Sequence, residues 1–207
     1  MMNVYHDATK ISSVMIIPVV GIVAYFSHEF VFIWTGDMEA AQRSGSVLRW
    51  YILGNGFLSM FAFQYYLQFA SGDLRYHVRF YTVVFIVYLP IVFFVAKNYG
   101  MIGTSLSWLV LQFTMFIVWV PFIHNKFANG HYKKWILEDI APSILVAATF
   151  FCLVDYLSID LKLYDRFELL VVMASFGLIL LLITILVYLK FVLKISIFSN
   201  WIISGKK

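Results

Sequence analysis

Six apolar stretches, each long enough to cross a lipid bilayer, restrict this chain to very few folds. A membrane-spanning helix needs about 20 consecutive, mostly apolar residues. Because backbone polar groups inside lipid must be paired within the spanning structure, such stretches predict helices. A transmembrane barrel would instead need short segments of alternating polarity, and these stretches do not alternate. The predicted spans run over approximately 11–34, 46–70, 78–96, 101–123, 140–158 and 167–192.

The composition excludes an ordinary soluble domain. Of the 207 residues, 62% are hydrophobic and 13% are charged, whereas soluble domains carry about 45–50% apolar and about 25% charged residues. A domain of this size exposes too much surface to hide the excess in a core. The sequence therefore predicts an all-α polytopic membrane protein, in which residues 1–207 form one transmembrane domain without a soluble domain.

The distribution of Lys and Arg predicts how the spans are oriented. These residues accumulate in the cytoplasmic loops of membrane proteins. With a cytoplasmic N-terminus, ten of them fall on the cytoplasmic side and five on the opposite side. The ten are Lys10, Arg75, Arg79, Lys126, Lys133, Lys134, Lys190, Lys194, Lys206 and Lys207, and the five are Arg43, Arg49, Lys97, Lys162 and Arg166. Both termini are therefore predicted to be cytoplasmic.

Patterns typical of enzymes, cofactor sites and metal sites are missing from the sequence. The single Cys152 excludes an intrachain disulfide, and the five histidines lie near predicted loops without metal-ligand spacing. No phosphate-binding loop, dinucleotide fingerprint or nucleophile–base motif occurs. The basic residues are dispersed between apolar stretches, which is not typical of a nucleic-acid-binding patch. We therefore expect no enzymatic activity, no cofactor, no metal and no nucleic-acid partner.

The second span carries the most informative polar residues. Gln64 and Gln68 are one helical turn apart and must share a side of the helix. Arg49, Trp50 and Phe57 fall on the same broad face, and a face of amides, aromatic rings and an arginine suits a sugar and a phosphate. These five residues are the candidates for a substrate cavity. The simpler interpretation is that the glutamines bond to a neighbouring helix and that Arg49 reaches the membrane surface.

Small residues predict close contacts and tight turns. Asn55, Ser59 and Ala62 lie roughly opposite the polar face and suit close packing against another helix. Gly100 and Gly103 predict a tight turn between the third and fourth spans, because glycine accepts backbone conformations that other residues avoid.

Asp155 lies near the outer end of the fifth span and is the candidate for a carboxylate that binds a coupling proton. Glu29 occupies a similar position near the end of the first span. The simpler interpretation of both carboxylates is solvation at the membrane surface.

Four short strings, in this order, resemble one transporter family. They are "FIWTGD" (32–37), "YYLQFASGD" (65–73), "YGMIGTSLSW" (99–108) and "HYKKWILEDIAPSI" (131–144). From about Tyr5 to Ile144 the chain resembles the C-terminal half of the polysaccharide or O-antigen flippases, the Wzx-type members of the multidrug/oligosaccharidyl-lipid/polysaccharide exporter superfamily. The last two spans agree with this family by position and hydropathy only.

The resemblance implies a two-bundle transporter of the bacterial inner membrane, built like the multidrug and toxin exporters (MATE-like). Such a protein would flip an undecaprenyl-diphosphate-linked oligosaccharide, a lipopolysaccharide building block, to the periplasmic leaflet. The cavity of such proteins is cationic, which makes Arg49, Arg75 and Arg79 candidates for contact with the diphosphate. The implied partners are the lipid-linked oligosaccharide, the bilayer, a polysaccharide polymerase and glycosyltransferases.

The chain has about half the length that the resemblance implies, and this leaves several functions open. It is expected to be the C-terminal part of an interrupted gene, or else a half that joins a separately encoded N-terminal half. A drug/cation antiporter of the same superfamily is the first alternative, and a non-transporting remnant is another. A membrane glycosyltransferase or polymerase is less favoured, because the longest connection, 125–139, is short and basic.

Overall fold

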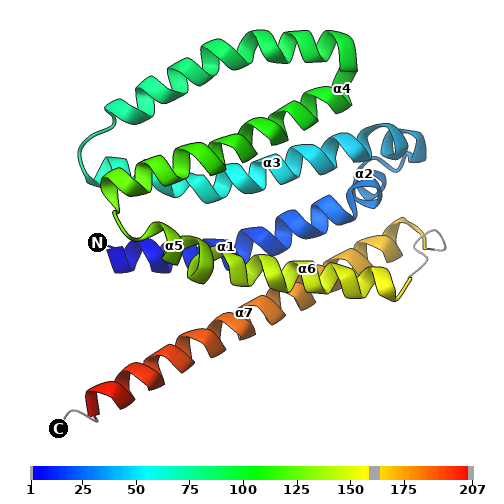
Figure 1. The fold of residues 1–207 in the computed structure, drawn as a ribbon. Coiled ribbons are helices and arrows are strands. Elements are labelled where there is room, and N and C mark those ends of the chain that lie inside the picture. Colours follow the sequence, from blue (N-terminus) through cyan, green and yellow to red (C-terminus); the bar gives the residue numbers. More distant parts are fainter. Residues whose placement is uncertain (1, 159–163, 205–207) are drawn as a thin grey trace.

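The computed structural model describes residues 2–158 and 164–204, with side chains as far as Lys190. Within these ranges the chain is helical and contains no strand, which confirms the predicted all-α class (Figure 1). Lys162, Lys206, Lys207 and the side chain of Lys194 lie outside the described part. The helices are α1 (Met2–Tyr25), α2 (Ser27–Thr35), α3 (Met38–Ala70), α4 (Arg75–Phe127), α5 (Tyr132–Lys134), the π-helix η1 (Trp135–Ile140), α6 (Ala141–Tyr156) and α7 (Arg166–Ser204).

The helix α4 is a hairpin of two long halves. Gly100 has φ 61° and ψ −153°, a conformation open almost only to glycine, and the chain reverses there (Figure 1). Phe80 stacks on Trp119 with ring centroids 3.7 Å apart. Tyr88 and Ser107 hydroxyls lie 3.1 Å apart. Because the residue closer to Gly100 on one half meets the closer residue on the other half, and the farther meets the farther, the halves run antiparallel. The predicted turn at Gly100 is confirmed.

A second tight reversal joins α3 to α4. Gly72 has φ 70°, the left-handed conformation that ends many helices. The Asp73 amide donates to the Gln68 carbonyl over 3.2 Å, which closes the last turn of α3. The short turn then places the first half of α4 antiparallel to α3.

The helix α1 lies in the middle of the molecule and separates two apolar clusters. On one side it packs with α3, α4 and η1 around residues such as Phe61, Val120 and Trp135. On the other side it packs with α6 and α7 around residues such as Ile22 and Leu180. The beginning of α1, the α3–α4 turn and the α4–α5 turn lie at one end of the bundle, on the left of Figure 1.

Two features differ from the sequence expectations. The predicted span 11–34 is divided at Phe26 between α1 and α2, and the 1% exposed Phe26 ring stacks on Phe176 of α7. The close contacts of α3 use Gly54 and Gly56, not the stripe that contains Ala62. A Cβ atom on Gly54 would lie 2.6 Å from Trp108, and one on Gly56 would lie 3.0 Å from Val20. Ala62 itself is exposed, so the stripe prediction was wrong at that position.

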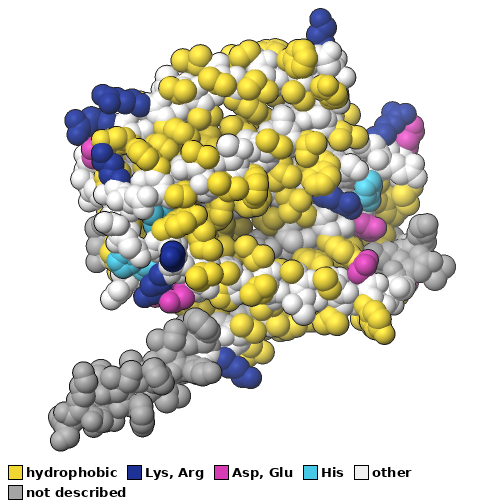
Figure 2. All heavy atoms as spheres, viewed as in Figure 1, with side chains coloured by type: hydrophobic (Ala, Val, Ile, Leu, Met, Phe, Trp, Pro, Cys, Tyr) yellow, Lys and Arg dark blue, Asp and Glu magenta, His cyan; other side chains and the backbone are white. Residues whose placement is uncertain are grey.

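The outer surface is apolar where lipid would touch it. Phe85, Ile86, Phe93 and Phe94 of α4 are each 64–69% exposed, and Figure 2 shows hydrophobic side chains over most of one face, with charged side chains mainly toward its two ends. Soluble monomers rarely expose apolar patches of this extent. The surface and the helices together indicate a membrane protein.

Four described helices are long and apolar enough to cross a membrane, judged by length and composition. They are Met2–Tyr25, Arg75–Phe127, Tyr132–Tyr156 and Arg166–Lys190. Arg75–Phe127 contains the third and fourth predicted spans in its two halves. The helix α3, which contains the second predicted span, is not among the four, since Asn55, Gln64 and its tyrosines lower its hydropathy. The count of six spans stays a prediction.

Candidate functional site

Polar side chains from α1, α3 and α4 meet inside the bundle around Gln64. The Gln64 amide nitrogen donates to the Tyr5 hydroxyl over 3.1 Å. The Tyr5 hydroxyl lies 3.2 Å from His124 Nε2, and His124 Nδ1 donates to the Val120 carbonyl over 2.9 Å. Because a carbonyl only accepts, Nδ1 carries the hydrogen and Nε2 accepts from Tyr5. Gln64 is 1% exposed and His124 is fully buried.

Gln68 continues this group one turn along α3. Its amide nitrogen donates to the Gln64 carbonyl oxygen over 3.0 Å, and its side chain is fully buried. The side-chain Oε1 atoms of both glutamines have no hydrogen-bond partner among the described residues. A buried polar atom without a partner is uncommon in native structures and calls for a physical reason.

A second group of polar side chains joins α1 to the segment before α6. His6 Nδ1 bonds to Asp139 Oδ2, and His6 Nε2 lies 2.9 Å from His131 Nδ1. Lys10 Nζ lies 3.7 Å from Asp139 Oδ1. His6 and Asp139 are 3% and 2% exposed. The buried carboxylate therefore has two partners inside the molecule: Lys10, which carries the opposite charge, and His6, which donates a hydrogen bond.

The π-helix η1 presents Asp139 to α1. A π-helical turn widens the backbone and is frequent at functional sites. Trp135, the first residue of η1, donates its Nε1 hydrogen to Thr9 Oγ1 over 3.2 Å, and that hydroxyl donates to the Tyr5 carbonyl over 2.9 Å. Thr9 therefore links the two groups into one, which we call the interior polar cluster. Its members are Tyr5, His6, Thr9, Lys10, Gln64, Gln68, His124, His131, Trp135 and Asp139.

The sequence pointed to Gln64 and Gln68 but missed most of the interior polar cluster. The sequence places His6, His124 and His131 near predicted loops, and Asp139 is the last residue of the connection 125–139, which stands out only as short and basic. The available signal was the spacing of His6 and Lys10, which lie one turn apart on α1 and therefore share a side.

The other candidates on α3 are placed away from the interior polar cluster. The half-buried Arg49 donates its Nε hydrogen to the Ala24 carbonyl over 3.1 Å, at the end of α1. Phe57 packs edge-on against Phe113 and Phe116 of α4, with centroids 5.3 Å and 5.4 Å away. Trp50 is half-buried. The five α3 candidates therefore lie mainly in contacts between helices of this chain, and their assignment to a substrate cavity stays a prediction.

Arg75 and Arg79 lie on the surface at the start of α4. The Arg75 guanidinium holds Asp73 with two bonds of 3.0 Å and 3.1 Å. These bonds hold the pKa of the Asp73 carboxyl below its ordinary value. Arg79 has no such ion pair among the described side chains and is the less engaged of the two cations.

Asp155 lies exposed near the end of α6, where it accepts a hydrogen bond of 3.3 Å from the Tyr25 hydroxyl. Glu29 is half-exposed in the first turn of α2. The deeply buried carboxylate is instead Asp139, so the structure adds a candidate for proton binding that the sequence did not single out. The role of Asp155 in coupling stays a prediction.

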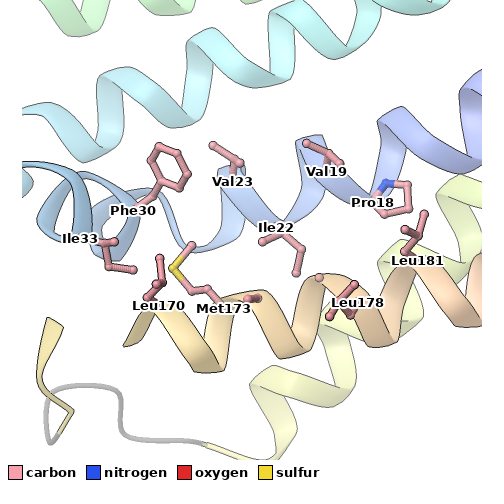
Figure 3. Close-up of a pocket in the computed structure, with 12 residues that line it drawn as sticks. Pro18, Val19, Ile22, Val23, Phe30, Ile33, Leu170, Met173, Leu178 and Leu181 are labelled. Carbon is pink, nitrogen blue, oxygen red and sulfur yellow. The ribbon is translucent and has the colours of Figure 1, made fainter. Parts of the chain in front are cut away.

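An apolar groove of about 510 Å³ runs between α1, α2 and α7. Figure 3 shows Ile22 and Val23 of α1 and Phe30 and Ile33 of α2 on one wall, with Met173 of α7 opposite. Every lining side chain is apolar, so the groove cannot recognise a sugar or a phosphate. Its chemistry suits a hydrocarbon chain.

No group of three potential metal ligands is found in the part of the chain that the structure describes. The comparisons with known proteins give no further identification, because no family profile, curated protein or solved structure matches this chain.

Proposed function

We propose that this chain is part of a multi-span transporter that flips an undecaprenyl-diphosphate-linked oligosaccharide across the bacterial inner membrane. The four ordered strings, from "FIWTGD" to "HYKKWILEDIAPSI", support the family and the substrate class. The chain reverses at alternate ends of the bundle, which agrees with the proposed six spans and two cytoplasmic termini (Figure 1).

The buried amides of Gln64 and Gln68 carry the most weight for transport. An unpaired polar atom away from water costs free energy, and the cost is higher where lipid surrounds the helices. Polar residues kept at membrane depth despite this cost usually mark a path for a polar substrate or an ion. Both amide oxygens are free to accept hydrogen bonds from sugar hydroxyls if the helices around them separate during transport.

The apolar groove supports a substrate with a lipid part. A lipid-linked oligosaccharide has a long hydrocarbon tail, a diphosphate and a polar head. The groove between α1, α2 and α7 suits the tail, and Arg49 and Arg79 offer charge for the diphosphate. One chain therefore contains surfaces of both kinds that an amphiphilic substrate needs.

Surface polysaccharide in a strain that depends on this protein tests the proposal. We expect Gln64→Leu and Gln68→Leu together to reduce export by about 10-fold or more, because two buried acceptors for the head group are lost. The matched control is Gln42→Leu, an exposed glutamine on the same helix, which should leave export unchanged. Normal export by the double variant, at normal protein level in the membrane, would reject the role of these residues.

The buried Asp139 favours one alternative, a drug/cation antiporter. Proton-driven antiport needs a carboxylate inside the membrane protein, and Asp139 is 2% exposed. The same strains distinguish the two functions: for the antiporter, Asp139→Asn would lower resistance to cationic drugs and leave surface polysaccharide intact.

A further inference from the structure

We infer that His131, His6 and Asp139 form a proton path that delivers a proton from the surface to the buried carboxylate. The use of this proton to drive substrate movement rests on the proposed transport function. The proton site itself does not, because it follows from the side chains alone.

The three side chains contact one another in the order His131, His6, Asp139, and the two that follow His131 are more buried than it is. His131 is half-exposed beside the α4–α5 turn, whereas His6 and Asp139 are almost fully buried. His131 Nδ1 lies 2.9 Å from His6 Nε2, and His6 Nδ1 bonds to Asp139 Oδ2. An imidazole with partners on both ring nitrogens can accept a proton at one and release it at the other.

The transfer balances without any further reactant. His131 first takes a proton from water at Nε2 and becomes a cation. It then passes its Nδ1 hydrogen to His6 Nε2, and His6 passes its Nδ1 hydrogen to Asp139 Oδ2. Asp139 ends as a neutral acid, and both histidines end as neutral rings with hydrogen at Nε2. Release of the proton from Asp139 and return of both rings to their first tautomers complete the cycle.

Several other titratable groups surround Asp139. The groups that interact with Asp139 are Tyr5 and Lys10 of α1, Glu138 of η1 and Tyr188 of α7. His124 of α4 faces His6 and His131, and the exposed Asp7 of α1 faces Tyr188. From α6, the residues beside Asp139 are the uncharged Pro142 and Ser143. Lys10 is the cation within 4 Å of the carboxylate, and it faces the oxygen that the histidine path does not use.

Protonation of Asp139 would loosen the contact between α1 and η1. It cancels the attraction between Asp139 and Lys10, and it reverses the hydrogen bond to His6, because the protonated Oδ2 then donates to the bare Nδ1. On its far side Asp139 borders a small cavity of about 10 Å³, with Thr184 and Tyr188 of α7 in its lining. This is near the least volume that holds one water molecule. The cavity lies between η1, α6 and α7 and leaves room for at most one water molecule beside the carboxylate.

Infrared spectroscopy of the purified full chain in lipid nanodiscs tests the site. All 11 acidic residues give a C=O stretch when they are protonated, so the spectrum of Asp139→Asn is subtracted from that of the unaltered protein at each pH. The difference should contain one C=O band that appears as the pH falls. The exposed Asp7, which follows His6 on α1, provides the control, so Asp7→Asn should retain the band that Asp139→Asn removes. The absence of a pH-dependent C=O band from the difference between the unaltered protein and Asp139→Asn would overturn the proton site.

The path is tested by the rate of proton uptake after a rapid drop in pH. Loss of a positioned proton carrier typically slows such a step by a factor of about 100. We expect this slowing for His6→Gln and for His131→Ala, and imidazole in the buffer should restore the rate for His131→Ala, since His131 is reachable from the surface. Unchanged uptake in both variants would overturn the path. If the proton results hold while export is unaffected by Asp139→Asn, the proton does not drive export and the proton site stands; the transport function is then decided by the Gln64 and Gln68 variants.

Discussion

At the scale of single residues, Gln64 allows function to be separated from stability. Replacing Gln64 with Leu removes the hydrogen bond to Tyr5 and the 3.4 Å contact of the amide nitrogen with His124 Nδ1, but it also removes an amide oxygen that is buried without a partner among the described residues. The two effects oppose each other, so we expect the free energy of unfolding to change by less than about 1 kcal/mol. Unfolding in mixed micelles with increasing amounts of a denaturing detergent measures this change.

Phe61 provides the comparison on the same helix. It is an apolar residue only 2% exposed, and Phe61→Ala leaves a cavity that should lower the unfolding free energy by about 3 kcal/mol. A loss as large for Gln64→Leu would show that Gln64 is a structural residue, and its link to transport would then lose its support.

Residue spacing predicted neighbours along one helix but not across helices. The period of the α-helix places Gln64 and Gln68 on one side, and this is what the structure shows. Their partners come from far away in the chain: Tyr5 is 59 residues from Gln64, and Asp139 is 133 residues from His6. These contacts depend on which helices become neighbours, and a single sequence without related sequences carries no signal for that choice.

At the scale of helices and turns, Gly100 makes the α4 hairpin. Its φ of 61° with ψ −153° is strained for any residue with a Cβ atom. We expect Gly100→Ala to lower the unfolding free energy by about 1–3 kcal/mol, measured by the same detergent titration. No atom lies within 4 Å of a Cβ added at Gly100, so the substitution creates no clash with a neighbour. The loss of stability would therefore come from backbone strain alone.

Gly177 is the matched control in α7. An added Cβ at Gly177 would meet Ile22 at 3.9 Å, an ordinary contact, in a regular helix. Alanine favours a helix over glycine by about 1 kcal/mol, so Gly177→Ala should leave stability equal or higher. Equal losses for the two substitutions would mean that the backbone at Gly100 is not the cause.

Turns with glycine were predictable, whereas breaks without glycine or proline were not. The predicted spans leave a short connection after residue 70 that contains Gly72, and Gly100 predicts the next turn; the structure has a reversal at both glycines. The break at Phe26 has no glycine or proline beside it, since its neighbours are Tyr25 and Ser27. The buried ring of Phe26, stacked on Phe176, fixes that break through tertiary packing. The π-helical turn at Trp135–Ile140 likewise accompanies the buried contacts of Trp135 and Asp139 with α1.

At the scale of the whole molecule, the composition predicted that lipid surrounds the helices, but it did not predict how the helices are arranged. The exposed apolar side chains of α4 and α7 are what a lipid-facing surface requires, and the hydrophobic content of the sequence already demanded such a surface. The central place of α1, between two apolar clusters, was not predictable because the hydropathy of a span does not indicate which other spans it packs against. Hydropathy identifies which segments enter the membrane, and packing detail decides which of them touch.

The predicted orientation of the bundle can be tested with the α4 hairpin and the turn after it. Asn98 lies beside the reversal at Gly100 and Asn129 lies in the α4–α5 turn, and both side chains are exposed. With both termini in the cytoplasm, the two positions fall on opposite sides of the membrane.

Cys152 is the single cysteine and is also exposed, so Cys152→Ser provides a background free of thiols. In that background, a membrane-impermeant maleimide should label Asn98→Cys when added outside intact cells. Asn129→Cys should react only after the membrane is opened, because the positive-inside rule places its basic neighbours in the cytoplasm. The reverse labelling pattern would show that the predicted orientation is wrong. His131 and the entrance of the proton path would then lie at the outer face of the membrane.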